Sequence, residues 1–168
     1  MTPPQKTHLR PATAADCALI LDFIRELAEY EKLLHEVVAT ETDLRQHLFG
    51  EHPMAEVIIA EWDGEPAGFA LYFHNFSTFL GKPGVYLEDL YVRPALRGRG
   101  IGRQLLARLA QLAVARGCGR LEWSVLDWNT PALRVYRAIG AQPMDEWTVQ
   151  RLSGQSLIQL AAEYEAND

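Results

Sequence analysis

A glycine-rich run is the part of this sequence whose residue types point most directly to chemistry. Residues 97–102 read Arg-Gly-Arg-Gly-Ile-Gly, between an apolar run that predicts a strand and a stretch with helical periodicity. Glycines let a ligand approach the backbone closely, and the N–H groups at the start of a helix attract anions. The run therefore predicts a cradle for a pyrophosphate, while a solvated loop with no ligand is the alternative reading.

Two common phosphate-binding motifs do not fit this run. A P-loop would continue with Gly-Lys-Ser/Thr, which does not follow here. A dinucleotide fingerprint would need a third small residue, whereas Arg103 and Leu105 occupy the available positions. The loop alone therefore leaves several anionic cofactors open.

Charge is distributed unevenly along the 168 residues. The formal net charge of −6 argues against a general nucleic-acid-binding protein, which needs a basic surface to neutralise phosphates. Acids outnumber bases over residues 22–51, whereas residues 93–103 contain four arginines and no acid. This polarity is suited to a cation at one end of a site and an anion at the other, although solvated faces would give the same pattern.

Other catalytic arrangements are not evident. No Ser-His-Asp or Cys-His pattern is present, which favours direct transfer over a covalent enzyme intermediate. Cys17 and Cys118 are too few for a disulfide framework, and His47 and His52 straddle a glycine and a proline, so no metal site is predicted. With no long apolar run and no signal-peptide core, we expect a cytoplasmic protein that does not contact the membrane.

Local signals predict the elements that position the glycine run. Capping-box patterns begin at Thr13 and Thr40, and an Asp-Gly pair at 63–64 lies between two apolar runs. The predicted order is helix 17–28, helix 41–49, strands 55–62 and 68–76, strand 85–92, helix 101–116, strand 121–126, a helix from 130 to 140, strand 147–152 and helix 155–164.

This order predicts an α/β (α+β) protein with a mixed sheet covered by helices. The strand-helix-strand unit of residues 85–126 should be parallel, with a right-handed crossover. Length and composition fit one domain over residues 1–168.

In this setting the glycine run resembles a known family. The strand YLEDLYV, the loop RGRGIG and the following helix are similar to the Arg/Gln-x-x-Gly-x-Gly/Ala segment of the GNAT superfamily of N-acetyltransferases. RPATAADC near the start, GEHP at 50–53 and LDWNTPALRVYRAIGA at 126–141 resemble its diamine acetyltransferase branch, the spermidine/spermine and thialysine enzymes. The resemblance covers nearly the whole chain. It implies the GNAT fold with a splayed mixed sheet, acetyl-CoA as donor, direct transfer to an amine, and a homodimer.

The resemblance also implies roles in cofactor binding. The backbone of the strand would pair with the pantetheine arm, the loop would hold the pyrophosphate, and a later asparagine would contact the cofactor arm. The residues concerned are Leu90, Tyr91, Val92, Arg97, Gly98, Arg99, Gly100, Ile101, Gly102, Arg103 and Asn129.

Two residues match the catalytic positions of the family. Glu88 corresponds to the glutamate that passes the amine's proton to water, and such a base is useful because an alkyl amine has a pKa near 10.4. Tyr136, beside the thioester sulfur, would protonate the leaving thiolate, a step uphill by about 2 kcal/mol at reference pKa values. The alternative for Tyr136 is an ordinary core residue, and for Glu88 an exposed acid on a strand.

Four further residues match substrate contacts. Asp89 corresponds to an acidic contact in the polyamine enzymes, and Trp147 follows two acids as the family's channel tryptophan does. At the aromatic position before the Gly-Lys turn the chain has Phe79, which departs from the family pattern and leaves the choice of substrate open, and Glu31 is a candidate contact for a distal amine. In a regular strand Glu88 and Asp89 would face opposite sides, so both reaching one site requires a bulge.

The acceptor is thus expected to be a small cation with a primary amine, either a polyamine or a lysine-like amino acid such as thialysine. The acidic stretch favours the polyamine. Two other functions stay open at this point: a non-catalytic acyl-CoA-binding module, and an N-acetyltransferase acting on a peptide or protein.

Overall fold

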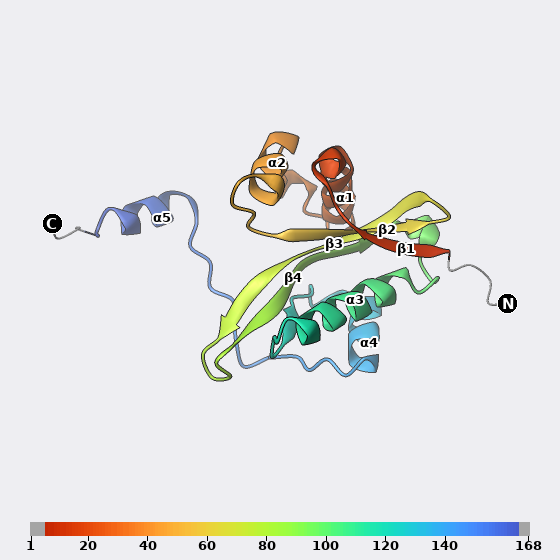
Figure 1. Ribbon diagram of the computed structural model, residues 1–168. Helices are drawn as coiled ribbons and strands as arrows, with labels where there is room; N and C mark the ends of the chain where they lie inside the picture. The colour runs from red at the N-terminus through yellow and green to blue at the C-terminus, as the bar shows by residue number, and fades with distance from the viewer. Residues whose placement is uncertain (1–5, 165–168) are drawn as a thin grey trace. The chain divides into compact units, whose positions relative to one another are not determined.

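The computed structural model describes residues 6–164, which contain one open mixed sheet with helices on both of its faces (Figure 1). The strands lie side by side in chain order: β1 (Thr7–Pro11), β2 (Glu56–Trp62), β3 (Glu65–Ser77), β4 (Lys82–Val92) and β5 (Leu121–Trp123). The first four are antiparallel, and β5 is parallel to β4. The predicted mixed sheet and the parallel β4–β5 connection are confirmed.

Five α-helices and three short 3-10 turns complete the described chain. The helices are α1 (Cys17–Tyr30), α2 (Glu41–Phe49), α3 (Ile101–Ala115), α4 (Thr130–Ala138) and α5 (Gly154–Ala161). The 3-10 turns are η1 (Ala14–Asp16), η2 (Leu34–Glu36) and η3 (Pro94–Leu96). Both predicted capping boxes form, and in the second one the Thr40 hydroxyl accepts from the Asp43 N–H at 3.2 Å.

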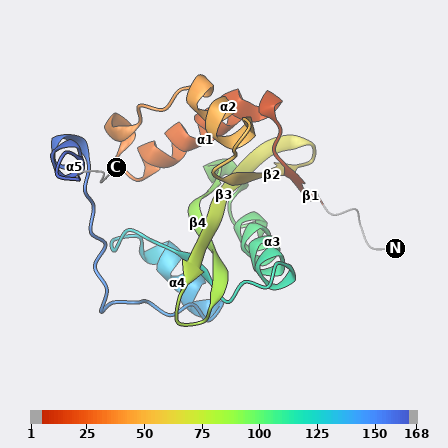
Figure 2. The same ribbon diagram turned by 60° about the vertical axis from the view of Figure 1, so that its left-hand side comes forward.

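Residues up to 126 form one compact unit in which helices cover both faces of the sheet. Helices α1 and α2 lie on one face and α3 on the other, as Figure 2 shows from a second side. The rings of Phe23 in α1 and Phe69 in β3 stack at 5.4 Å, and both are fully buried. Burying a ring of this size stabilises the fold by roughly 1.5–3 kcal/mol. Because both faces are covered, residues 57–60 of β2 are all buried rather than alternating with exposed ones.

Residues 127–164 form a second unit with few regular elements. Asn129 caps α4, its side-chain oxygen accepting the Ala132 N–H at 3.4 Å. Residues 141–153 contain no helix or strand, and neither α4 nor α5 has a fully buried residue.

Two sequence predictions about the elements are wrong. The strand expected at residues 147–152 does not form, because its alternating pattern has no neighbouring strand to pair with among the described residues. Conversely β1 was not predicted, since it is a short segment held only by its pairing with β2, some fifty residues further on. The strand predicted over 121–126 is shorter, ending at Trp123.

Candidate active site

The centre of the candidate site is a β-bulge in β4. Leu71 of β3 lies opposite Asp89 while the next residue, Tyr72, lies opposite Leu87, so Glu88 is the inserted residue. A bulge of this kind bends the strand and changes the directions of the side chains around it. Glu88 is exposed and Asp89 partly buried. The bulge that both acids would need to reach one site is therefore present.

Beyond the bulge, β4 has a free edge. It pairs with β5 only over Val85–Leu87, and no described strand continues that pairing along residues 88–92. Backbone N–H and C=O groups that point to this side are therefore not paired with another described strand, and the Val92 carbonyl accepts from Arg97 Nε at 3.0 Å. An extended ligand with amide groups, such as the pantetheine arm, fits such an edge in the way an added strand would.

The glycine run leads from this edge into α3 in a conformation that side chains disfavour. Gly98 and Gly100 have φ angles of 77° and 78°, in the left-handed region. Gly100 is the N-cap of α3 and offers no capping side chain, so the first N–H groups of this 15-residue helix are left for another acceptor. A Cβ at either glycine would meet no atom within 4 Å, so the loop is open on its outer side. The run therefore fits a pyrophosphate.

Two of the loop's arginines are held against aromatic rings. The guanidinium of Arg97 lies 4.8 Å from the ring centre of Tyr30, and its Nε donates to the Val92 carbonyl at 3.0 Å. The guanidinium of Arg99 lies 5.0 Å from the ring centre of Trp62. Contacts of this kind are worth about 0.5–1 kcal/mol each at exposed positions. They keep positive charge beside the loop, whereas Arg103 lies exposed on the first turn of α3.

The acids predicted for the amine end interact with one another. Burial, together with the negative charges of Glu88 and Glu31, raises the pKa of Asp89 to about 7. Burial also raises the pKa of Glu31, at the C-terminal end of α1. Asp89 thus interacts electrostatically both with Glu88 of its own strand and with Glu31 at the end of α1. A cation placed here would relieve the repulsion among the three carboxylates.

The remaining predicted site residues do not belong to the bulge or to the glycine run. Phe79 is 94% exposed in the turn between β3 and β4. Lys82, the first residue of β4 after this turn, lies about 20 Å from Glu88 along the strand, at roughly 3.3 Å per residue. Phe79 is therefore far from the bulge. Trp147 is 76% exposed, and Tyr136 is half-buried on α4; both belong to the second unit. Their proposed roles, like that of Asn129, stay predictions.

Sequence reasoning missed the aromatic supports of the arginines. Tyr30 and Trp62 lie far from the glycine run in sequence, and no local spacing relates them to it. Only the sheet, which brings the β2–β3 turn near the start of α3, makes the second contact possible. No group of three His, Cys, Asp or Glu side chains within residues 6–164 is arranged to hold a metal ion. No helix in this range is both long and apolar enough to cross a membrane.

A glycine loop at a helix start, after a bulged strand in a mixed sheet, is the arrangement expected of an acyl-CoA-dependent transferase. A sequence model of the Acetyltransferase (GNAT) family matches residues 21–141, and the chain belongs to this family. It is an acetyltransferase that acts on amine substrates, and members of the family use acetyl-CoA.

Several known proteins are similar to this chain over most of its length. The chain is 42% identical to a thialysine N-epsilon-acetyltransferase of Bos taurus, covering 91% of this chain and 96% of the relative. It is 32% identical to an L-ornithine acetyltransferase of Arabidopsis thaliana, covering 90% of this chain and 86% of the relative. Among solved structures, an integron cassette protein from the mobile metagenome of V. cholerae superposes with a TM-score of 0.78 at 30% identity, covering 94% of this chain and 98% of that one.

Proposed function

We propose that this enzyme transfers the acetyl group of acetyl-CoA to the primary amine of a small cation, either a diamino acid of the thialysine type or a polyamine. The observation that carries the proposal is the group of Glu31, Glu88 and Asp89, beside a strand edge that leads to an anion-binding loop. An amine substrate is a cation at neutral pH, and this group supplies its counter-charge.

Different observations support the polyamine and the diamino acid as substrate. The acidic group suits any polyamine, which carries positive charge only. The names of the relatives, thialysine and L-ornithine acetyltransferases, favour a diamino acid. A diamino acid also carries a carboxylate, for which Arg97 is a candidate, since its guanidinium lies 4.8 Å from the ring centre of Tyr30, the neighbour of Glu31.

The chain's own residues have the following roles in the proposed reaction. Bound acetyl-CoA supplies the thioester carbonyl that the amine attacks. When acetyl-CoA is bound, the edge of β4 at Leu90, Tyr91 and Val92 would hold its pantetheine amides, and the N–H groups of the glycine loop would hold its pyrophosphate.

Proton transfer falls to three side chains. Asp89 and Glu31 hold the ammonium, and Glu88, exposed at the bulge, accepts its proton and passes it to water. Tyr136 would donate its phenolic proton to the departing thiolate and regain a proton, through water, from the nitrogen that becomes the amide. No covalent enzyme intermediate is needed, since the amine itself is the nucleophile.

We further infer that residues 1–168 act as one catalytic domain, in the cytoplasm, as a homodimer. The family match runs across residue 126, where the two compact units divide. Free Cys17 and Cys118 suit a reducing compartment. Exposed apolar side chains on the second unit suit burial against another copy of the chain, among them Trp147, Val149, Leu152, Leu157, Ile158 and Leu160.

The test is a panel of amines incubated with the purified enzyme and acetyl-CoA, with free thiol release as the readout. We expect turnover of thialysine, ornithine or spermidine, and little turnover of a peptide with a free N-terminus. Turnover of the peptide alone would replace this proposal with protein N-acetylation. A change of Asp89 to Asn should raise KM for the preferred amine while leaving the affinity for acetyl-CoA intact.

A further inference from the structure

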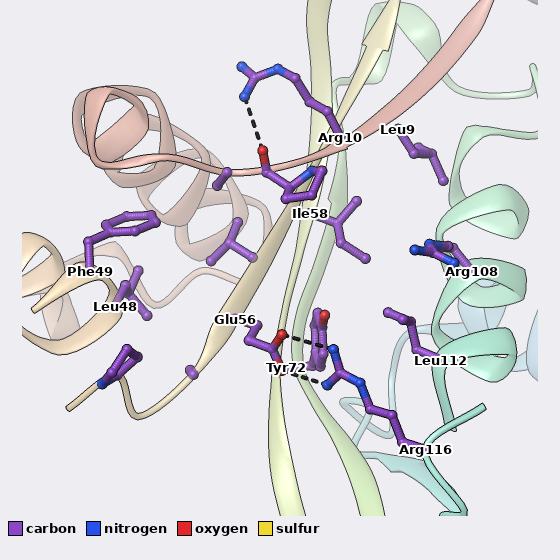
Figure 3. Close-up of a pocket in the computed structure, with 15 residues that line it drawn as sticks. Leu9, Arg10, Leu48, Phe49, Glu56, Ile58, Tyr72, Arg108, Leu112 and Arg116 are labelled. Carbon is purple, nitrogen blue, oxygen red and sulfur yellow. Dashed lines mark hydrogen bonds and ion pairs between the residues drawn. The ribbon is translucent and has the colours of Figure 1, made fainter. Parts of the chain in front are cut away.

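A cavity lies at the border of the sheet that β1 forms. It has a volume of about 370 Å³ and is lined from β1, β2, β3, α2 and α3, without any residue of β4 or of the glycine run (Figure 3). It opens where β1 ends, because β1 pairs with β2 only as far as Pro11 and Ile58. The strand edge beyond this point is left uncovered by β1.

The walls of the cavity are mainly apolar. Leu9 and Ile58 come from the two strands, Leu48 and Phe49 from α2, and Leu112 from α3. The ring of Tyr72 forms part of the same wall (Figure 3). Cavities of this volume and lining bind small ligands whose body is hydrophobic.

Two of the three arginines in the lining are already neutralised. Arg10 donates to Asp16 at 2.8 Å and to Glu61 at 2.7 Å. Arg116 makes a two-pronged ion pair with Glu56, with N–O distances of 2.7 Å and 3.0 Å. This pair lowers the pKa of Glu56, so the carboxylate stays ionised and occupied.

Arg108 differs from these two. Within residues 6–164 its hydrogen-bond partner is the neutral side chain of Gln111, at 2.6 Å, and it forms no ion pair with a carboxylate. It lies beside Leu112 on the α3 side of the cavity (Figure 3). The cavity therefore combines a largely apolar lining with one exposed cationic group, Arg108, that has no carboxylate partner among residues 6–164.

We propose that this cavity binds a small amphipathic monocarboxylate, with its apolar body against Ile58 and Leu112 and its carboxylate on Arg108. Guanidinium and carboxylate match in charge and geometry, and an apolar alcohol of the same shape lacks that match. The occupant would contact Tyr72, which lies opposite Leu87 next to the bulge, so it touches the strand pair that shapes the active site.

The test uses 4-phenylbutyrate as probe and isothermal titration calorimetry on the full chain, with saturating coenzyme A present to block the cofactor loop. We expect binding under these conditions, with affinity at least tenfold above that of 4-phenyl-1-butanol. Arg108→Gln should weaken the probe roughly tenfold, in line with the loss of a charged hydrogen bond. Arg108→Lys should restore part of the affinity, and Arg45→Gln, which removes an exposed charge on α2, should change nothing.

Three results would overturn the proposal: displacement of the probe by coenzyme A, equal affinity for the alcohol, or equal affinity of the Arg108→Gln variant and the wild type. None of these results bears on acetyl transfer, because Arg108 lies outside the residues assigned to that reaction.

Discussion

The two ends of the candidate active site are built by different physical means. At the anion end, the glycine loop owes its character to local backbone conformation, with two glycines at positive φ and a helix start without a capping side chain. At the cation end, acids from α1 and β4 acquire their character through burial and mutual repulsion. The anion end should therefore be insensitive to pH near neutrality, whereas the cation end should titrate there.

The largest effect is expected from removing the exposed acid of the bulge. Glu88→Gln should lower kcat at pH 7 about a hundredfold, because the amine loses its proton acceptor while its binding groups remain. Steady-state kinetics with the preferred amine measure this effect. Glu65→Gln, which removes an exposed charge at the start of β3, is the matched control and should behave as wild type. A loss of less than threefold in kcat for Glu88→Gln would remove the base role.

The next effect concerns the conformation of the loop. Gly100→Val forces a β-branched residue into the left-handed region at the N-cap of α3, which turns the helix start away from the pyrophosphate. We expect roughly thirtyfold weaker binding of acetyl-CoA by calorimetry. Gly117→Val imposes a similar strain, at φ 71°, just beyond the other end of the same helix. If both variants lose affinity equally, the effect is general strain and the cradle is not involved.

The pH dependence of the free energy of unfolding should reveal the raised pKa of Asp89. Asp89 has a pKa of about 7 in the fold, well above the value near 4 of the unfolded chain, so the folded state binds more protons between these values. Stability contributed by protonated Asp89 is therefore present at low pH and is lost as the pH rises through 7.

Asp89→Asn should consequently stabilise the protein at pH 8, by roughly 2 kcal/mol, and much less at pH 5. Thermal unfolding at the two pH values measures the difference. Asp22→Asn, on the exposed side of α1, serves as control and should shift neither melting temperature. An equal effect of Asp89→Asn at both pH values would contradict the raised pKa.

The smallest effect is expected from removing the aromatic ring that supports Arg99. Trp62→Leu removes the ring beneath Arg99 and should weaken acetyl-CoA binding about threefold, the equivalent of one cation–π contact. The binding should also become more sensitive to salt, because a less ordered arginine interacts through longer-range charge only. Unchanged affinity would show that Arg99 needs no support.

The sequence allowed prediction of those features that depend on neighbouring residues. The capping boxes at Thr13 and Thr40 and the glycine loop are local chemistry, and each forms in the expected place. A bulge was the condition for Glu88 and Asp89 to reach one site, because adjacent residues in a regular strand face opposite sides, and β4 contains one. These are statements about residues at most a few positions apart.

Features that depend on distant partners could not be predicted in the same way. Strand β1 forms because β2 accepts its hydrogen bonds, while residues 147–152 have a suitable pattern and no strand to pair with. The contact of Arg99 with Trp62 and the influence of Glu31 on Asp89 arise only when the sheet and helices are assembled. Pattern alone did not distinguish a strand with a partner from a strand without one.

The central claim, that the acidic group binds the substrate as a cation, is tested most directly by counting protons on amine binding. Calorimetric titration of the preferred amine into the coenzyme A complex at pH 7, in buffers of different ionisation enthalpy, gives the number released. A bound ammonium lowers the pKa of Asp89, so the account predicts release of about half a proton, absent in Asp89→Asn. No proton release, or the same release from the variant, would contradict it.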